Sequence, residues 1–174
     1  MGDLRARRIF FALVLVGAAL LGALEVALAR SGNPIVRPSA PWVTPLQDMD
    51  AALARADLAA AAAARHRAHL AALGCRSWEG FIAVGDAALR MAEASGDRRA
   101  MEPAARRAYL RALTYARAQR SLDGVLRATE SFARLGDRDS VEQGIRMARD
   151  LAGTDDDAQA RVATQAGLWI GDSL

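Results

Sequence analysis

The residue types that most often perform chemistry in proteins gather at one place in this sequence, between positions 66 and 75. His66 and His69 stand three residues apart, and Cys75, the only cysteine, follows closely. Metal-binding pairs on helices use an i, i+4 spacing or a Glu-x-x-His arrangement, and no second cluster could complete the ligand set. The flanking Arg65 and Arg67 would also repel a cation. We therefore expect no metal site and two solvent-facing histidines.

Other catalytic patterns are also missing from the sequence. It contains no Gly-rich phosphate loop, no Ser/His/Asp set and no pair of carboxylates at a defined spacing. Asp155, Asp156 and Asp157 could attract Ca²⁺, but acidic residues in the first turn of a helix are sufficiently explained by the helix dipole. We therefore expect that the protein is not an enzyme, and that it needs neither a cofactor nor a small-molecule substrate.

The composition indicates an all-α fold. Apolar residues make up 52% of the chain but aromatic residues only 5%, and much of the apolar fraction is alanine, the best helix former. All 23 basic residues are arginine. From Ser31 onward, 19 arginines face 18 acidic residues, so the net charge of this part is near +1. Because these charges are interspersed rather than gathered in a stripe, we expect no nucleic-acid partner.

A long apolar segment near the N-terminus, Ile9 to Ala29, predicts a membrane anchor. Its 21 residues fall within the roughly 17–25 that a transmembrane helix needs, and Glu25 lies close to one end. Arg5, Arg7 and Arg8 precede the segment, so the positive-inside rule places the N-terminus in the cytoplasm. The large apolar residues that we expect in contact with lipid are Ile9, Phe10, Phe11, Leu13, Leu15, Leu20, Leu21 and Leu24.

A cleaved secretory signal is the alternative interpretation of residues 1–30. The arginines would form its basic region, Ile9 to Leu24 its apolar region, and Ala27-Leu28-Ala29 its cleavage site. Both interpretations export residues 31–174. We expect a single-pass protein of a bacterial inner membrane, with a cytoplasmic tip and anchor in residues 1–30 and a periplasmic C-terminal domain.

Residues 31–45 are predicted to form an extended linker, because they hold four of the five prolines. Trp42 lies in this linker. It either covers the end of the first exported helix or contacts lipid headgroups or a membrane partner. Trp169, within the apolar tail of the chain, is a second candidate for a partner contact.

Residues 46–174 are predicted to form about six helices. Thr44-Pro45-Leu46-Gln47 resembles a capping box, and we expect one long Ala-rich helix from there to Leu73, with Gly74 as its stop. Serine, aspartate and threonine residues predict the starts of the later helices. These helices are expected at 78–95, 98–120, 122–135, 138–151 and 155–171, with Ser77, Asp97, Ser121, Asp137 and Thr154 as their caps.

A repeat is visible within this domain. The turns Gly96-Asp97 and Gly136-Asp137 stand 40 residues apart, and several further identities share that offset. Identities at one fixed offset indicate helical hairpins that bury their faces against their neighbours. Arg106 and Arg146 occupy equivalent positions in the two copies, so they are our candidates for residues that line a binding groove.

The second copy, Val125 to Ala152, resembles a tetratricopeptide repeat. Ala128 and Thr129 stand where that family has its Leu-Gly pair, and Phe132 and Ile145 stand at its two aromatic positions. Val141 and Ala148 take the small alanine positions, and Gly153 replaces the terminal proline. The period here is 40 rather than the family's usual length of about 34. The first copy keeps the turn and the alanines but lacks the aromatic residues.

This resemblance implies a stack of antiparallel helical hairpins whose concave face binds a protein or peptide. An irregular helical bundle with one copied hairpin is the structural alternative. With the anchor, the pattern predicts a membrane-bound interaction or scaffold module that aids the assembly or stability of a membrane complex. Two other roles stay open on sequence alone, a permanent accessory subunit of a multi-subunit membrane complex and a cleaved, soluble periplasmic protein.

Overall fold

The computed structural model describes residues 40–171, except for the side chain of Ile170. Within that range all regular structure is helical, which confirms the predicted all-α class, and there are seven helices rather than about six. They are α2 (Val43–Ala54), α3 (Leu58–Cys75), α4 (Trp78–Ser95), α5 (Arg98–Ala118), α6 (Leu122–Leu135), α7 (Arg138–Ala152) and α8 (Asp156–Gly171).

The predicted membrane segment, Ile9 to Ala29, lies outside the described residues, and so does the linker up to Ser39. In the part of the chain that is described, no helix has both the length and the hydropathy needed to cross a bilayer. The last three residues assigned to the linker, 43–45, already belong to α2, so the boundary predicted at Leu46 falls three residues late.

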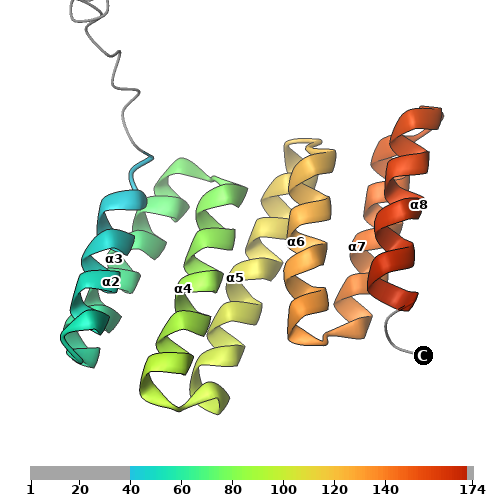
Figure 1. Ribbon diagram of the computed structural model, residues 1–174. Coiled ribbons are helices and arrows are strands. Elements are labelled where there is room, and N and C mark those ends of the chain that lie inside the picture. Colours follow the sequence, from blue (N-terminus) through green and yellow to red (C-terminus); the bar gives the residue numbers. More distant parts are fainter. Residues whose placement is uncertain (1–39, 172–174) are drawn as a thin grey trace, which may run out of the picture. The chain divides into compact units, whose positions relative to one another are not determined.

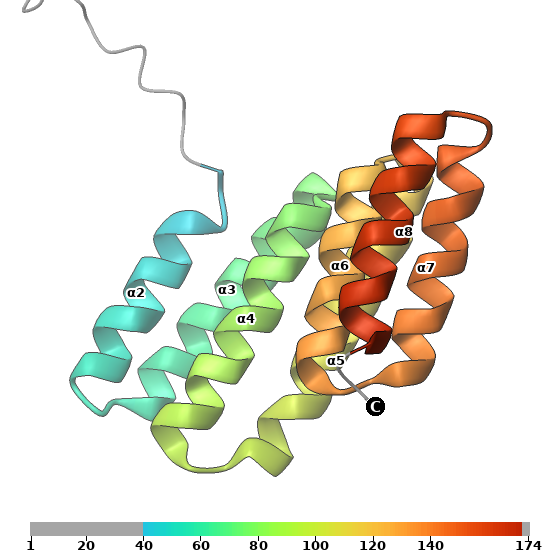
Figure 2. The same ribbon diagram turned by 45° about the vertical axis from the view of Figure 1, so that its right-hand side comes forward.

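The helices form three successive antiparallel hairpins, α2–α3, α4–α5 and α6–α7, and α8 packs on the last of them (Figure 1). Each helix packs mainly against the helix before it and the helix after it in the chain. The even-numbered helices also contact one another in series, α2 with α4, α4 with α6 and α6 with α8. They form one layer, in front in Figure 1, and the odd-numbered helices form the second layer behind it, an arrangement that Figure 2 shows turned by 45°.

The long helix predicted from Leu46 to Leu73 is wrong, because the chain breaks after Ala54 and folds back. Ala56 adopts a left-handed conformation with φ 56°, and Asp57 then caps α3 by accepting a hydrogen bond of 2.9 Å from the amide of Ala60. Neither glycine nor proline marks this break. It converts one Ala-rich helix into a hairpin whose two helices bury each other's alanines.

This break is a third copy of the predicted turn. Positions 56, 96 and 136 all have positive φ, at 56°, 70° and 73°, and stand at the same 40-residue interval. Aspartate follows each of them and caps the next helix, through Asp57, Asp97 and Asp137. The first copy escapes detection in the sequence because alanine replaces glycine at position 56.

The connections between hairpins form a second repeated turn. Arg76 and Arg120 take left-handed conformations at the ends of α3 and α5. Ser77 and Ser121 then cap α4 and α6, as predicted, by accepting hydrogen bonds of 3.1 and 3.0 Å from the amides three residues on. These connections are 44 residues apart, whereas the turns within hairpins are 40 apart. The difference is one helical turn, because α4 has 18 residues and α6 has 14.

Three other predicted helix ends are corrected. Helix α2 begins at Val43 with no side-chain cap, so the Thr44 capping box does not form. Helix α3 passes through Gly74, which is helical, and ends at Cys75. The cap of α8 is Asp155, whose carboxylate accepts a 3.0 Å hydrogen bond from the amide of Ala158, and not Thr154. Aspartate and threonine are both favourable N-cap residues, so the sequence alone does not decide which of the adjacent residues Thr154 and Asp155 caps the helix.

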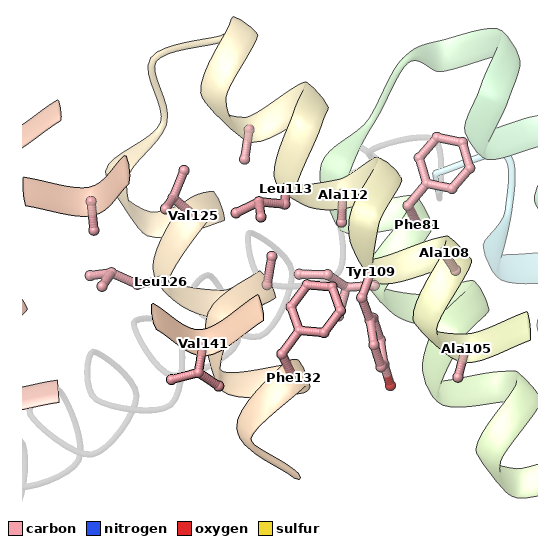
Figure 3. Packing of buried hydrophobic residues seen from close by; sticks show 14 of the residues in the cluster. Phe81, Ala105, Ala108, Tyr109, Ala112, Leu113, Val125, Leu126, Phe132 and Val141 are labelled. Carbon is pink, nitrogen blue, oxygen red and sulfur yellow. The ribbon is translucent and has the colours of Figure 1, made fainter. Parts of the chain in front are cut away.

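The helices approach closely because small residues on one helix face large ones on another. The ring of Tyr109 lies against Gly85, Trp42 covers Gly80, and Trp78 covers Gly124. In each case a Cβ atom on the glycine would collide with its neighbours. Figure 3 shows Tyr109 beside Phe132, whose ring it meets edge to face with centroids 5.9 Å apart. Three aromatic side chains, each packed against a glycine, thus connect different helices.

A polar connection crosses three helices at the same place. The hydroxyl of Tyr109 donates a 2.7 Å hydrogen bond to Asp86 on α4, and Arg134 on α6 lies 3.4 Å from the same carboxylate oxygen. Burial, followed by this hydrogen bond, raises the pKa of Tyr109 well above its ordinary value. Tyr109 therefore stays protonated and serves as a fixed donor.

The buried apolar residues form two clusters. The main cluster extends from the C-terminal half of α3 to α8, and Figure 3 shows its centre around α5 and α6. The smaller one is formed by residues of α2, α3 and α4, namely Met49, Ala52, Ala61, Ala64, Ala87 and Met91. The terminal hairpin thus joins the rest of the stack partly through alanines and two methionines.

Replacement of Gly85 by alanine tests the close approach of α4 and α5. The added methyl group collides with the buried ring of Tyr109, so we expect Gly85→Ala to lower the free energy of unfolding by about 1–3 kcal/mol. Gly74→Ala is the matched control, because its helical site is open and alanine should stabilise it by about 0.5–1 kcal/mol. Denaturant unfolding measures both. Equal effects would contradict the packing described for Gly85.

The strain at Ala56 gives a second prediction. A non-glycine residue in the left-handed region costs about 1 kcal/mol, so Ala56→Gly should raise the free energy of unfolding by up to about that amount. The reverse change at the equivalent position, Gly96→Ala, should lower the free energy of unfolding by a similar amount, because alanine is strained at its φ of 70°. No neighbouring atom lies close to the added Cβ, so no steric collision adds to this effect. A destabilised Ala56→Gly protein in thermal unfolding would show that this turn is not left-handed.

Candidate functional site

The two layers of the stack differ in how closely their helices pack, and this difference leaves a groove. Among the described helices, α5 and α7 contact each other, but no Cα atom of α3 lies within 8 Å of one in α5. Helix α4 forms the floor between them. The resulting groove has a volume of about 380 Å³. Its lining residues are Arg65, His66 and His69 from α3, Val84 from α4, and Ala104, Arg107, Ala108, Leu110 and Arg111 from α5.

The groove is basic and holds no acidic side chain. Five of its nine lining residues are arginine or histidine, and none is aspartate or glutamate. Within residues 40–171, none of Arg65, Arg107 and Arg111 forms an ion pair, whereas nine other arginines do. Like charges at one place repel each other, and the described residues offer no counter-charge there. This arrangement favours an anion.

Arg65 is the most constrained of these groups. Its Nε atom is buried and has no hydrogen-bond partner, the one side-chain atom of this kind in the described range. Burial, and then the charge of Arg107, lower the pKa of its guanidinium. A buried donor without a partner costs roughly 1–3 kcal/mol, and more when it is charged. The free protein therefore keeps an unfavourable group at the wall of the groove.

Arg111 and His69 are held in place by aromatic contacts. Nη1 of Arg111 lies 3.2 Å from Nε2 of His69, across the groove. The Arg111 guanidinium also lies over the ring of Phe81, 5.8 Å from its centroid, and His69 meets the same ring edge-on at 5.5 Å. Phe81 in turn stacks on Tyr115. These contacts orient Arg111 before any ligand arrives.

The two histidines are therefore part of the groove, although no metal-binding role is indicated for them. His66 is exposed, as predicted, whereas His69 is partly buried. Cys75 is exposed and unpaired. No group of three His, Cys, Asp or Glu side chains in the described part of the chain is placed to hold a metal ion. Arg107 and Arg111 were not singled out in the sequence, because they stand more than 40 residues from Arg65 and among many other arginines.

Arg106 and Arg146, the candidates drawn from the repeat, lie elsewhere and are not brought together. Nε of Arg106 pairs at 2.9 Å with the mostly buried carboxylate of Asp137, at the edge of a larger pocket of about 600 Å³. Three arginines and three acidic residues line that pocket, so its charges balance. Arg146 is exposed and pairs at 4.0 Å with Glu142 of its own helix. A role for either in binding stays a prediction.

The two tryptophans predicted to contact partners are both partly buried. Trp42 lies against Gly80 at the start of α4, so it does cover a helix end, although that of α4. Trp169 packs against the main apolar cluster from α8. A contact of either with lipid or a partner stays a prediction.

Exposed leucines lie on the two helices that form the basic groove. Five large apolar residues are exposed in the described range, and four of them lie on α3 and α5. Leu110 lines the groove itself. On α3, Leu70 stands four residues after His66 and Leu73 four residues after His69, which places each one turn from a lining residue on the same side of the helix. The fourth is Leu58, seven residues before Arg65.

Comparison with known proteins adds no assignment, because no protein-family model, curated protein or solved structure matches this chain significantly.

The pKa of His69 predicts a pH-dependent stability. Burial, and then the charges of Arg111, Arg65 and His66, lower it in the folded state. The unfolded chain therefore binds this proton more readily, and stability should fall as the pH drops through the ordinary histidine range near 6.5. Between about pH 7.5 and 5.5 the melting temperature should decrease more for the native protein than for His69→Gln. Parallel curves would contradict the inferred environment of His69.

Proposed function

We propose that this protein is a membrane-anchored interaction module that binds a protein partner on the periplasmic side and aids the assembly or stability of a membrane complex. The observation that carries the proposal is the clustering of exposed apolar side chains. Four of the five exposed large hydrophobic residues in the described range lie on α3 and α5, the two helices that form one groove, and Leu110 lines that groove.

Single exposed leucines are ordinary on protein surfaces, but a cluster of them is not. Leu70 keeps 52% of its surface exposed, and Leu73 and Leu110 keep 40% each. Burial of such side chains by a partner contributes roughly 25 cal/mol for each Å² removed from water. The groove between them is recessed, and pockets of this kind tend to lie at binding sites. A protein segment that entered the groove would bury these leucines.

The composition of α3 supports the same role. Several of its exposed residues are apolar, namely Leu58, Ala59, Ala62, Ala63, Leu70 and Leu73. Exposed apolar residues of this number on one helix favour contact with another element, although His66 and Arg67 of α3 are exposed as well. Small alanine side chains also allow a second backbone to approach closely. The hairpin arrangement, with its neighbour-to-neighbour packing, resembles the repeat architectures that bind peptides and proteins on extended surfaces.

The location in this proposal comes from the predicted anchor, Ile9 to Ala29, and from the arginines before it. A tether of this kind would hold the module close to the membrane, where its partners would be other membrane-bound chains. High local concentration would then allow a modest interface to be occupied.

Site-specific exchange of the exposed leucines tests the proposal. The full-length tagged chain is recovered from native membranes in mild detergent, and co-purifying chains are quantified by mass spectrometry. We expect the double variant Leu70→Gln, Leu110→Gln to lose most of a partner that the native protein retains, because about 1 kcal/mol of apolar burial is removed per half-exposed leucine and a buried polar amide is added.

Leu168→Gln is the matched control, since Leu168 is the fifth exposed large hydrophobic residue and lies on α8, away from the groove. Its partner recovery should equal that of the native protein. Circular dichroism of each variant checks that the fold is intact. Equal recovery of the same chains with the groove variant, or recovery of none with the native protein, would overturn the proposal.

A further inference from the structure

We infer that the α3–α5 groove recognises an acidic, extended segment of a partner protein, whose carboxylates pair with Arg65, Arg107 and Arg111. This inference rests on the proposed function and specifies the chemistry of the partner. It follows from the charge of the groove, its shape and the lack of an ion-pair partner for Arg65 among the described residues.

The charge of the groove is set by its two walls together. Arg65 stands on α3, while Arg107 and Arg111 stand on α5 one turn apart, and no lining residue is acidic. The pocket of about 600 Å³ beside Arg106 balances its three arginines with Glu102, Asp137 and Asp139. A net positive recess attracts anionic groups. Guanidinium groups pair with carboxylates through two parallel hydrogen bonds, which makes the match specific.

Two states of Arg65 can be compared. In the free protein its buried Nε has no partner and its pKa is lowered by burial and by Arg107. A carboxylate in the groove would accept a hydrogen bond from the outer nitrogens of the Arg65 guanidinium, since the buried Nε is out of its reach, and would weaken the repulsion between the two arginines. An anion therefore stabilises a site that is unfavourable without it.

The shape of the groove favours a polypeptide segment over a flat lipid surface. The charged groups flank a recess whose remaining lining residues are Val84, Ala104, Ala108 and Leu110. Arg107 and Arg111 lie four residues apart on a helix, a rise of roughly 6 Å. Carboxylates on alternate residues of an extended chain are separated by about 6.6 Å, so they match this spacing. Apolar side chains of the same segment could then cover Leu70 and Leu110.

A peptide-binding experiment on the full-length protein in zwitterionic detergent tests the inference. The probe is a labelled ten-residue peptide with Glu at every second position and Leu or Ala between them. Fluorescence anisotropy should show saturable binding that weakens as salt rises from about 50 to 300 mM. The same peptide with Gln in place of Glu should bind at least about 10-fold more weakly, because the charge-assisted pairs are lost.

The arginine variants distinguish binding in the groove from non-specific attraction to the positive charge of the helix. Arg107→Gln with Arg111→Gln should weaken binding of the Glu peptide by at least about 10-fold. Arg99→Gln with Arg117→Gln is the matched control, since it removes the same charge from exposed positions of the same helix outside the groove. Its affinity should change by less than about 2-fold. Equal losses in the two double variants would overturn the inference.

The variant Arg65→Met distinguishes a ligand-binding role of Arg65 from a purely structural one, because stability and affinity should change in opposite directions. Removal of the buried, unpartnered Nε should raise the melting temperature of the free protein, while the affinity for the Glu peptide falls. A residue that only supported the fold would lose stability and binding together. A lower melting temperature with unchanged affinity would show that Arg65 does not contact the ligand.

Other ligands are distinguished in the same assay. Full competition by a few millimolar inorganic phosphate would reveal a simple oxyanion site. Groove-dependent binding of phosphatidylglycerol vesicles without peptide binding would reveal a lipid surface. Either result overturns the inference. If the leucine variants lose their native partner but the Glu peptide does not bind, the acidic character is wrong and the proposed function stands.

Discussion

The close approach of neighbouring helices is the constraint on which the rest of this structure depends. Aromatic residues make up only 5% of the chain, so large side chains cannot fill wide gaps between helices. The helices instead approach closely at glycine and alanine, and three of the aromatic side chains lie over glycines. Tyr109 on Gly85 and Trp78 on Gly124 illustrate this arrangement. Dispersion contacts at such short range compensate for the small apolar surface of each residue.

The same constraint produces the groove. Even-numbered helices pack in an unbroken series, whereas α3 and α5 stand apart in the second layer, with α4 beneath them. Positive charge is tolerable there because the space is open to water on one side, and Phe81 holds both Arg111 and His69. The helices thus pack closely where aromatic rings lie over glycines, and they leave a gap between α3 and α5 in the second layer. Binding sites commonly arise where a rigid framework leaves such a recess.

Local chemistry explains which features could be predicted from the sequence. Ser77, Asp97, Ser121 and Asp137 cap helices through hydrogen bonds within four residues, so their role is visible in a short window. The break at Ala56 could not be seen in the same way, since alanine there carries no mark of a left-handed turn. Only the common 40-residue spacing reveals it. The groove could not be predicted for a related reason. Positive and negative residues are interspersed along the sequence, and an excess of positive charge arises only where α3 and α5, which are distant in the sequence, come together in the fold.

The separate small cluster of Met49, Ala52, Ala61, Ala64, Ala87 and Met91 has a consequence for the order of unfolding. Stacks that contact only their neighbours tend to open from an end, one hairpin at a time. The α2–α3 hairpin lies at one end of the stack and buries few large side chains, so it is suited to exchange its amide hydrogens before α4–α5 does. Because Arg65 belongs to that hairpin and Arg107 to the next, occupancy of the groove would cross-link two cooperative units. Binding of a ligand in the groove would therefore stabilise the α2–α3 hairpin against local unfolding, and local unfolding of that hairpin would weaken binding.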